Sequence, residues 1–364
     1  MGTKKIQLGI LGLGEGRSAV SAALNSELVE LKLLCDVDEA QCKLRSKEFG
    51  FDAYTLSYSE MLGRKDIDTI AIYTPDQLHA RHIAQALEAG KHVICTKPLL
   101  NDLSEAADLL TLGQKYPGKV FVGQSSRFFE PMLKQRSDFE QGCIGDLETI
   151  EAYYNADHRW FLEKKWSTES SFKWLFGGLS HPVDLIRWYL PDIEEVMGYG
   201  YLSRNGREHG LKNVDTMHFV LRAVDGRVAR VSGAYTGPVQ PVARDSEMSC
   251  ILRGREGASQ ADYMDLRYAI SDRKGEERML TWEHRLKHYF RFEGKSHHAG
   301  EYQNYFEYFA RSLSDNAPAR PDLREGVGTV VLLTAMEQSL AEGKPVRLHT
   351  VLEANNLPFD LLST

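Results

Sequence analysis

The chain has 364 residues, of which 42% are hydrophobic and 26% are charged, and its formal net charge is −7 at pH 7. This length exceeds what one small core needs and predicts two domains, and the composition is that of a globular protein. The negative net charge argues against a nucleic-acid surface. No apolar run approaches the roughly 20 residues that span a bilayer, so we expect neither nucleic acid nor a membrane as a partner.

The chain contains five scattered cysteines and no Cys-x-x-Cys pair: Cys35, Cys42, Cys95, Cys143 and Cys250. This usage is typical of buried thiols in a reducing compartment rather than of a disulfide framework or a zinc site. Residues 1–5 lead directly into a strand-like segment and lack the apolar core of a signal peptide. These features predict a cytoplasmic protein.

The first predicted elements are a strand, a glycine-rich turn and a helix. Residues 5–11 form an apolar run, the turn occupies 12–17, and 18–24 read as a helix. In this setting glycines allow a tight turn whose backbone N–H groups approach the pyrophosphate of a dinucleotide. The third glycine of the usual spacing is replaced by Arg17, and a glycine stands one residue earlier. The predicted cofactor contacts in this turn are Gly12, Gly14, Glu15, Gly16 and Arg17.

The second predicted strand, 28–35, ends at Asp36. An acidic residue about 20 positions beyond the glycines can accept hydrogen bonds from the ribose hydroxyls of NAD. Asp38 adds a second negative charge that would repel the 2′-phosphate of NADP, so NAD is favoured over NADP. The alternative is that Asp36 only caps the helix predicted over 38–49.

Strands and helices continue to alternate as far as residue 123. The predicted strands are 52–55, 69–73, 92–95 and 120–123, and the predicted helices are 57–62, 78–89 and 103–116. This alternation predicts a doubly wound parallel sheet with right-handed crossovers. Lys97 follows the strand 92–95 and precedes Pro98, which cannot continue a central strand. Because ligands bind at the carboxyl ends of such strands, we expect Lys97 to lie between a dinucleotide and a substrate.

The alternation stops near residue 125, where we place a domain boundary. Strand-like runs cover 147–155, 196–202, 216–224, 228–235 and 249–252, and helices are predicted over 131–141, 181–190, 301–313 and 324–340. Asp225-Gly226 predicts a hairpin turn between two of the strands. The prediction is therefore a first domain over 1–125 and an α+β second domain over 126–364 with a mostly antiparallel sheet.

Three motifs make a family resemblance specific: Thr74-Pro75-Asp76-Gln77-Leu78-His79, Ala86-Leu87-Glu88-Ala89-Gly90-Lys91-His92-Val93 and Thr96-Lys97-Pro98. The chain resembles the glucose–fructose oxidoreductase / inositol dehydrogenase / rhizopine-catabolism (Gfo/Idh/MocA) family, which typically reads Thr-Pro-Asn-x-x-His, Ala-Leu-x-Ala-Gly-Lys-His-Val and Glu-Lys-Pro there. The resemblance implies a Rossmann domain, then a domain with a large open sheet that often pairs with another subunit. A homodimer or homotetramer is therefore expected. It also implies an NAD(P)-dependent reaction on a sugar, inositol or polyol, with Thr74, Pro75, His79 and Thr96 as cofactor contacts.

The resemblance also marks two departures from the family pattern. Lys97 matches the family's lysine, whereas Thr96 replaces its glutamate. His181 matches a histidine that acts with the lysine, but Gly177 stands where an aspartate usually precedes it by four residues. Either the proton relay is simpler here, or another acid such as Asp157 or Asp184 replaces that aspartate. The bland alternative for His181 is a helix-capping or core histidine.

Further candidates stand at predicted strand ends in the second domain. Asp157, His158 and Tyr235 are predicted substrate contacts, with ordinary structural use as the alternative for each, and Arg127 is a weaker candidate. His297-His298 resembles a metal pair, but adjacent side chains do not converge on one ion and no cysteine or carboxylate stands at ligand spacing. We therefore predict no metal site.

The predicted reaction is hydride transfer between nicotinamide and a hydroxyl-bearing carbon. A neutral His181 could accept the proton while a cationic Lys97 stabilises the oxygen, or a Lys97 of lowered pKa could be the acid/base itself. An NAD-dependent glycosidase that oxidises the sugar transiently at C3 is an alternative. A cofactor-binding regulator or pseudoenzyme is another, suggested by Thr96 and Gly177.

Overall fold

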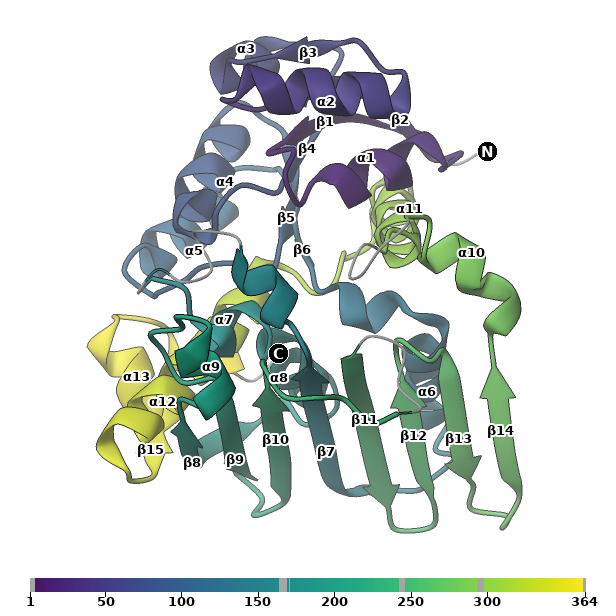
Figure 1. The fold of residues 1–364 in the computed structure, drawn as a ribbon, viewed down its shortest axis with the longest axis vertical. Helices are drawn as coiled ribbons and strands as arrows, with labels where there is room; N and C mark the ends of the chain where they lie inside the picture. Colours follow the sequence, from purple (N-terminus) through teal and green to yellow (C-terminus); the bar gives the residue numbers. More distant parts are fainter. Residues whose placement is uncertain (1–3, 164–168, 170, 242–245, 293–297, 363–364) are drawn as a thin grey trace. The chain divides into compact units, whose positions relative to one another are not determined.

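The computed structural model describes the chain except for residues 1–3, 164–168, 170, 242–245, 293–297 and 363–364 (Figure 1). The chain packs into two compact units. Unit 1 comprises Met1–Ser125 and Leu286–Val327, and unit 2 comprises Ser126–Arg285 and Gly328–Thr364. The sequence analysis assigned 286–327 to the second domain, whereas in the structure this segment packs within unit 1. In the part of the chain that the structure describes, no helix has the length and apolar character needed to cross a membrane.

Unit 1 is built on a six-stranded sheet in the order β3-β2-β1-β4-β5-β6, and all of its pairs are parallel. Its strands are β1 (Ile6–Leu11), β2 (Val29–Cys35), β3 (Tyr54–Thr55), β4 (Thr69–Ile72), β5 (His92–Thr96) and β6 (Val120–Gly123). Its helices are α1 (Arg17–Leu24), α2 (Glu39–Phe49), α3 (Tyr58–Gly63), α4 (His79–Glu88), α5 (Ala106–Lys115), α10 (Leu286–Tyr289) and α11 (Gly300–Ser314). Figure 1 shows α4 and α5 on one face of this sheet and α1 and α11 on the other. The predicted doubly wound parallel sheet is confirmed.

The burial of the strands in unit 1 follows from this double cover. All four residues of β4 are buried, as are Val93, Ile94 and Cys95 of β5. Strands covered on both faces consist of near-continuous apolar residues, which explains why they were visible in the sequence. On α11, the aromatic side chains pack against β6: the ring of Phe121 lies 5.6 Å from that of Tyr305 and 5.7 Å from that of Phe309. This contact ties 286–327 to unit 1.

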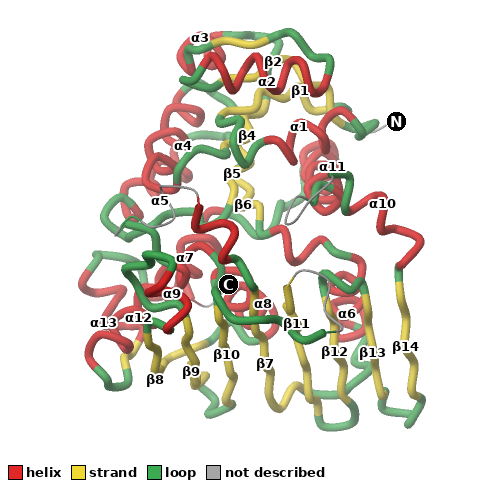
Figure 2. The backbone as a smooth tube through the Cα atoms, in the orientation of Figure 1, coloured by secondary structure: helices red, strands yellow, loops and turns green. Residues whose placement is uncertain are grey.

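Unit 2 is built on a nine-stranded sheet in the order β14-β13-β12-β11-β7-β10-β9-β8-β15. Its strands are β7 (Leu147–Ala156), β8 (Ile193–Tyr201), β9 (Thr216–Ala223), β10 (Val228–Ala234), β11 (Ser246–Gly254), β12 (Ala258–Asp262), β13 (Arg267–Ser271), β14 (Glu277–Thr281) and β15 (Val346–Arg347). Its helices are α6 (Glu130–Glu140), α7 (Trp174–Gly177), α8 (Ser180–Tyr189), α9 (Arg204–Glu208) and α13 (Leu348–Ala354), and α12 (Leu323–Glu342) begins in unit 1 and continues here. Figure 2 shows α6 and α8 behind the strands, on one face of the sheet.

All neighbouring strands of unit 2 are antiparallel except β7 and β10, which run parallel from the pair Thr149–Val228 to the pair Asn155–Ala234. The mostly antiparallel sheet is thus as predicted. The sequence analysis missed β12, β13, β14 and β15. Every residue of β14 is exposed, so this edge strand has no buried face that would produce an alternating pattern.

The parallel pair β7 and β10 brings two strand ends together. The backbone N–H of His158, just after β7, donates to the carbonyl of Tyr235, just after β10, at 3.0 Å. Helix α8 packs across β7, β10 and β11. Its approach requires Gly233, because a Cβ there would lie 2.5 Å from Leu179 Cδ1 and 2.6 Å from the carbonyl oxygen of Tyr154. The predicted candidates of the second domain therefore meet at one end of the sheet.

Candidate active-site residues of the two units

The glycine turn after β1 is shaped by three glycines with different roles. Gly12 has a positive φ of 87°, and a Cβ there would lie 2.7 Å from the carbonyl oxygen of Tyr73. A Cβ on Gly16 would lie 2.0 Å from the carbonyl oxygen of Gly12, so Gly16 provides the close packing of turn and helix. Around Gly14, in contrast, no described atom lies within 4 Å of an added Cβ. The backbone is therefore open at Gly14, which fits the approach of a pyrophosphate.

Arg17 replaces the glycine of the usual spacing and was predicted to contact the cofactor. In the structure its side chain contacts two other residues of unit 1. Its guanidinium forms an ion pair with Glu48 of α2 and lies 4.2 Å from the centre of the Phe292 ring. Arg45 binds the other carboxylate oxygen of Glu48 at 2.7 Å and donates to the carbonyl of Leu13 at 3.0 Å. Glu48 thus already binds Arg17, and Gly16 rather than position 17 meets the packing requirement.

Asp36 lies at the end of β2 and faces the glycine turn. Its Oδ2 accepts a hydrogen bond from the backbone N–H of Leu13 at 2.8 Å, and its Oδ1 accepts one from Asp38 at 3.0 Å. A carboxylate has about four acceptor positions, so two remain for ribose hydroxyls. The N-cap of α2 is Asp38, which accepts from Ala40. Asp38, and not Asp36, is therefore the residue that caps α2. The acceptor positions left on Asp36 and the open backbone at Gly14 fit NAD.

His79, a predicted cofactor contact, connects two backbone segments through its ring. Its ring is buried, with Nδ1 2.9 Å from the carbonyl oxygen of Pro98 and Nε2 2.8 Å from that of Thr74. Burial lowers the pKa of His79, and a neutral imidazole donates to one of these carbonyls at a time. The ring thus connects the end of β4 to the turn after β5.

Lys97 lies directly after β5, where the Lys97–Pro98 peptide bond is cis. Burial lowers the pKa of the Lys97 amine to about 8, although the negative charges of Glu15 and Asp76 act in the opposite direction. Thr96 ends β5, and Thr74 and Pro75 follow β4, so these predicted residues share the carboxyl edge of the sheet. An amine with a pKa near 8 can take up and release a proton close to neutral pH.

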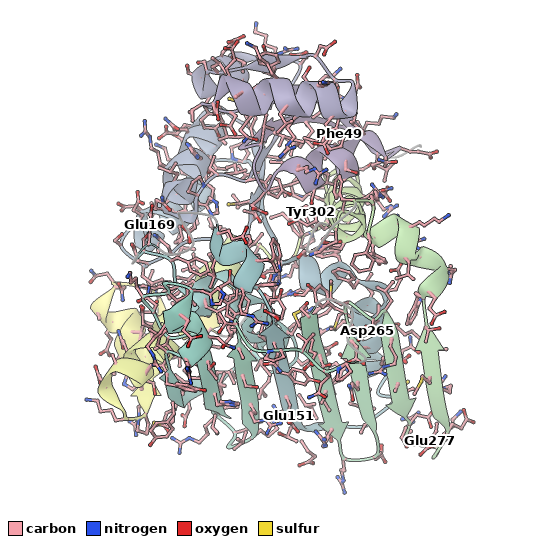
Figure 3. The ribbon with its side chains drawn as sticks, viewed as in Figure 1. Phe49, Glu151, Glu169, Asp265, Glu277 and Tyr302 are labelled. Atoms are coloured by element: carbon pink, nitrogen blue, oxygen red, sulfur yellow. The ribbon has the colours of Figure 1, made fainter. Side chains whose placement is uncertain are left out.

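Three tyrosines pack together next to the glycine turn, and the sequence analysis assigned none of them to the candidate site. Tyr73 follows β4; its ring stacks on Tyr302 of α11 (labelled in Figure 3) at 5.8 Å, and its hydroxyl hydrogen-bonds that of Tyr305. The backbone of Tyr73 is also what Gly12 packs against. The position of Tyr73 immediately before Thr74-Pro75 was a signal in the sequence, but its partners come from a segment more than 200 residues away.

In unit 2, His181 lies in the first turn of α8 and is buried. The ring of His181 contacts the ring of Tyr154 on β7, with their centres 5.9 Å apart. Tyr154 in turn lies 5.1 Å from Trp174 of α7, and Trp174 stacks on Tyr235 at 4.3 Å. These rings belong to one group, which we call the aromatic cluster: Tyr154, His158, Trp160, Phe161, Phe172, Trp174, His181 and Tyr235.

The two glycines between α7 and α8 have opposite surroundings. A Cβ on Gly178 would lie 2.0 Å from the indole of Trp174, so only glycine leaves room for that ring. A Cβ on Gly177 would meet only Phe172, at 3.4 Å, and Gly177 has no positive φ. Packing therefore explains Gly178, whereas around Gly177 the described residues leave room for a Cβ at ordinary contact distance.

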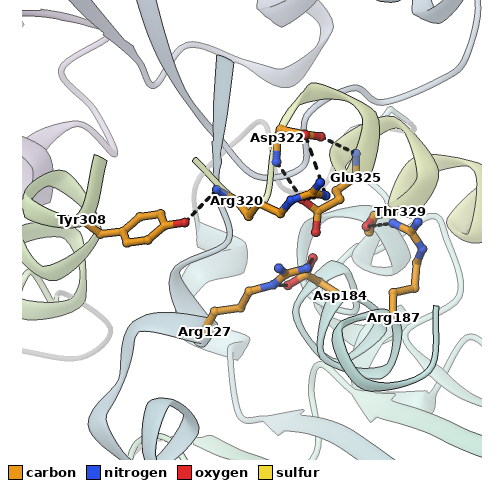
Figure 4. Close-up of polar contacts among 8 residues, drawn as sticks. All are labelled: Arg127, Asp184, Arg187, Tyr308, Arg320, Asp322, Glu325 and Thr329. Carbon is orange, nitrogen blue, oxygen red and sulfur yellow. Dashed lines mark hydrogen bonds and ion pairs between the residues drawn. The ribbon is translucent and has the colours of Figure 1, made fainter. Parts of the chain in front are cut away.

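Both acids considered as replacements for the aspartate missing at position 177 form ion pairs with arginines. Asp184 receives two hydrogen bonds from Arg127, at 2.6 and 2.8 Å, and both side chains are buried (Figure 4). Asp157 receives two from Arg159, at 2.7 and 2.6 Å. Each carboxylate is thus paired with its own arginine through both of its oxygens. Asp184 and Arg127 are thus parts of a buried ion pair in unit 2.

Within the described residues, no group of three or more His, Cys, Asp or Glu side chains is placed to hold a metal ion. His298 binds Glu301 at the start of α11 through its Nδ1. Its neighbour His297 lies outside the described residues.

Comparison with known proteins decides the family. Residues 6–124 match the Gfo/Idh/MocA oxidoreductase family with an NAD-binding Rossmann fold, and residues 137–348 match the C-terminal α/β domain of the same family. The chain belongs to the Gfo/Idh/MocA family. It is therefore an NAD-binding oxidoreductase, and the predicted family, enzyme class and cofactor are confirmed.

Three proteins that are similar to this Gfo/Idh/MocA protein share less than 30% of its sequence with it. The uncharacterized oxidoreductase YrbE of Bacillus subtilis is 24% identical over 355 residues, which cover 96% of this chain and 98% of YrbE. An alpha-N-acetylgalactosaminidase of Shewanella oneidensis is 28% identical over 169 residues, which cover 44% of this chain and only 37% of that protein. A levoglucosan dehydrogenase in complex with NADH has a TM-score of 0.80 at 17% identity, covering 95% of this chain and 99% of that one. The last similarity shows the fold alone.

Proposed function

We propose that this Gfo/Idh/MocA protein is an NAD-dependent dehydrogenase that oxidises a CH–OH group of a sugar, inositol or related polyol, with Lys97 and His181 as its catalytic residues. The observation that carries the proposal is Lys97: an amine at the carboxyl edge of a nucleotide-binding sheet with its pKa lowered to about 8. Groups whose pKa is shifted toward neutrality by burial are typical of proton-transfer sites.

Bound NAD supplies the acceptor for the hydride, and the protein must remove the hydroxyl proton. We assign that proton to the neutral Nζ of Lys97, because burial has already reduced the cost of deprotonating it. The half-buried Lys97 side chain also has Glu15 and Asp76 near enough to raise its pKa, so its ammonium form after proton uptake is stabilised.

His181 binds and orients the substrate oxygen in this proposal. The aspartate that stands four residues earlier in the family is Gly177 here, and Asp184 is held by Arg127. The lowered pKa of Lys97 is the observation that supports Lys97 as the proton acceptor.

The residues proposed to hold NAD come from the edge of the unit 1 sheet. The open backbone at Gly14 and the N-terminus of α1 would bind the pyrophosphate, and Asp36 the ribose of the adenosine. Thr74, Pro75 and Thr96 are proposed contacts for the nicotinamide half. Thr96 would bind a ribose hydroxyl through a neutral hydroxyl group, in place of the glutamate of the family's Glu-Lys-Pro pattern.

The test is a substrate panel. The purified protein is incubated with NAD and a series of aldoses, cyclitols and alditols, and the absorbance of NADH is followed. We expect one chemical group of the panel to reduce NAD. Tight binding of NAD without reduction by any sugar, cyclitol or polyol would instead favour a regulator or pseudoenzyme.

An NAD-dependent glycosidase is the second candidate, and the similarity to the Shewanella oneidensis alpha-N-acetylgalactosaminidase favours it. The matched segment covers 37% of that relative, so its activity comes to this chain only as a hypothesis. Nitrophenyl glycosides distinguish the two reactions. Release of nitrophenol without accumulation of NADH would replace the dehydrogenase proposal with this one.

We also propose that the protein forms a cytoplasmic homodimer or homotetramer. Large side chains are exposed on the strands of unit 2, among them Tyr199 (71%), Tyr201 (59%) and Val220 (52%). An uncovered sheet face with such residues is typical of an interface between subunits. Light scattering of the purified protein measures the assembly, and a monomer at all concentrations would contradict it.

A further inference from the structure

Two arginines beside the glycine turn bind the same carboxylate. Arg17, at the start of α1, donates from Nε to Oε1 of Glu48 at 2.7 Å, and Arg45 of α2 donates from Nη1 to Oε2 of Glu48 at 2.7 Å. The side chains of Arg17, Arg45 and Glu48 are 24%, 12% and 23% exposed. Because ion pairs that are partly buried are screened by salt much less than exposed ones, Glu48 holds both guanidinium groups in place.

The charges of this group do not cancel. Burial raises the pKa of Glu48, but hydrogen bonds from Arg17 and Arg45 outweigh burial and keep the pKa below its ordinary value. Glu48 is therefore a carboxylate at neutral pH, and its single negative charge faces two guanidinium groups that are always protonated. Without the charge of Glu48, both arginines could bind another anion.

The position of Arg45 connects this group to the predicted adenosine site. Its Nε donates to the backbone carbonyl of Leu13 at 3.0 Å, and the backbone N–H of the same Leu13 donates to Asp36 at 2.8 Å. Arg45 and Asp36 therefore contact the two backbone polar groups of one residue in the glycine turn. Asp36 is the residue proposed to bind the ribose of the adenosine, so Arg45 lies close to the part of the nucleotide in which NAD and NADP differ.

The chemistry of the two cofactors explains what the arginines could bind. NADP carries a phosphate at the 2′ position of this ribose, where NAD has a hydroxyl group. Dinucleotide-binding folds bind the hydroxyl group with an acidic residue and accommodate the phosphate with a nearby arginine, whose planar guanidinium can bind two phosphate oxygens. This chain carries the acidic residue, Asp36, and also two arginines, but Glu48 already binds both of them.

We propose that Glu48 is a specificity-determining residue, which excludes NADP by binding the two arginines that could otherwise bind its 2′-phosphate. Discrimination against NADP then has two sources: Asp36 repels the phosphate, and Glu48 withholds the cations that would attract it. The inference rests on the proposed place of the adenosine ribose at Asp36, and it does not depend on which alcohol the protein oxidises.

The test compares Glu48→Gln with the control Asp66→Asn in the full chain. Both changes remove one negative charge from a carboxylate that binds arginine in unit 1. Asp66 binds Arg64 ahead of β4, at the amino edge of the parallel sheet, whereas the glycine turn follows β1 at the carboxyl edge. The control therefore frees an arginine at the wrong edge for the cofactor.

The dissociation constants of NADH and NADPH are measured by fluorescence titration. Glu48→Gln should lower the ratio of the NADPH constant to the NADH constant about 10- to 100-fold, as expected for new charge-assisted hydrogen bonds. Asp66→Asn should leave this ratio unchanged. An unchanged ratio in Glu48→Gln, or an equal decrease in both variants, would overturn the inference.

Further substitutions show whether the arginines carry the effect. Adding Arg17→Met or Arg45→Met to Glu48→Gln should raise the ratio again toward that of the natural protein. A gain in NADPH affinity that persists in both double variants would come from the lost charge alone and would also overturn the inference. Melting temperatures without cofactor are measured first, and Glu48→Asp takes the place of Glu48→Gln if the latter does not fold. Its shorter side chain cannot bind both arginines as Glu48 does, so the ratio should fall by a smaller factor.

Binding constants separate this inference from the proposed function, because they need no turnover. Asp36→Asn should weaken the binding of NADH, since Asp36 is the proposed ribose contact. Unchanged affinity for NADH in Asp36→Asn would contradict the proposed place of the ribose and the inference with it. Weaker binding of NADH in Asp36→Asn, together with an unchanged ratio in Glu48→Gln, would contradict this inference alone.

Discussion

The candidate residues of unit 1 work through backbone geometry and fixed charges, whereas those of unit 2 work through packed aromatic side chains. In unit 1 the glycine turn, Asp36 and Lys97 each follow directly after a strand of one parallel sheet. In unit 2, the ring of His181, from a helix, contacts Tyr154 of β7, and further rings of the same cluster come from α7 and from the segment after β10. The first arrangement needs few residue types at fixed places, and the second depends on how distant segments pack. If the first arrangement binds the nucleotide and the second the substrate, as proposed, the cofactor site is fixed by backbone geometry and the substrate site by side chains.

The largest effect on activity should come from removing the Lys97 amine of unit 1. Lys97→Ala removes the proposed proton acceptor, so kcat should fall about 10²- to 10⁴-fold, the usual contribution of general acid–base catalysis. Affinity for NAD, measured by fluorescence titration, should survive, because the amine is not assigned to the pyrophosphate or the adenosine. Undiminished activity in this variant would falsify the assignment of Lys97.

The second prediction compares how much a buried and a partly exposed ion pair of unit 2 contribute to the free energy of unfolding. Asp184→Asn leaves Arg127 buried without its anion, since both side chains are at most 4% exposed, and should lower the free energy of unfolding by about 3–5 kcal/mol. Asp157→Asn, in a pair whose side chains are 28% and 40% exposed, should cost about 0–1 kcal/mol. Denaturant unfolding measures both. Similar losses for the two variants would remove the distinction between a structural acid at 184 and a surface acid at 157.

The third prediction distinguishes two glycines of the same turn in unit 1. Gly16→Ala places a methyl group against the Gly12 carbonyl and should destabilise the protein without cofactor by about 2–4 kcal/mol. Gly14→Ala places a methyl group in open space, so the melting temperature without NAD should hardly change. The affinity of Gly14→Ala for NAD should nevertheless fall, because the open backbone there is the proposed approach of the pyrophosphate. Unchanged affinity for NAD in Gly14→Ala would contradict that role.

The fourth prediction concerns pH and separates the lysine of unit 1 from the histidine of unit 2. Lys97 accepts a proton only when neutral, and its pKa is lowered to about 8. The kcat/KM for oxidation should therefore rise about tenfold per pH unit below pH 8 and level off above it. If Lys97 must instead stay cationic while His181 is the base, kcat/KM should decline above pH 8. A pH series at saturating NAD shows whether kcat/KM levels off or declines above pH 8.

The smallest effect is expected at Gly177. Gly177→Asp restores the family's aspartate at a position where an added Cβ meets only Phe172, so we expect the fold to tolerate it with a change below about 1 kcal/mol. A carboxylate beside His181 would raise the pKa of the imidazole and change the pH profile by a few-fold in rate. Loss of folding in Gly177→Asp would show that packing, and not chemistry, selects the glycine.

Much of unit 1 could be predicted because its elements carry local signals. Buried parallel strands appear as apolar runs, and the glycine turn and Lys97-Pro98 stand at their ends. The role of His79 could not be predicted in the same way. Its motif indicated a cofactor contact, yet both of its ring nitrogens face backbone carbonyls of other segments.

In unit 2 the central strands were recognised, but β12 to β15 were not. The exposed edge strand β14 has no apolar alternation, and the two-residue β15 pairs with β8 after a gap of about 145 residues along the chain. On the open face, Glu151 (labelled in Figure 3) binds Arg230 and Arg253 across three strands, a charged pattern that hides the strand period. The aromatic cluster was missed as a unit because its members come from separate segments.

The sequence by itself determined the family, the parallel sheet, the cofactor class and the candidates Lys97 and His181, because each depends on residues close together in the chain. Only the tertiary structure decided that Gly16 replaces the missing glycine and that Asp184 is held by Arg127. It also decided that residues 286–327 belong to unit 1. Close approach, burial and pairing are relations between distant segments, and local patterns of residues do not contain them.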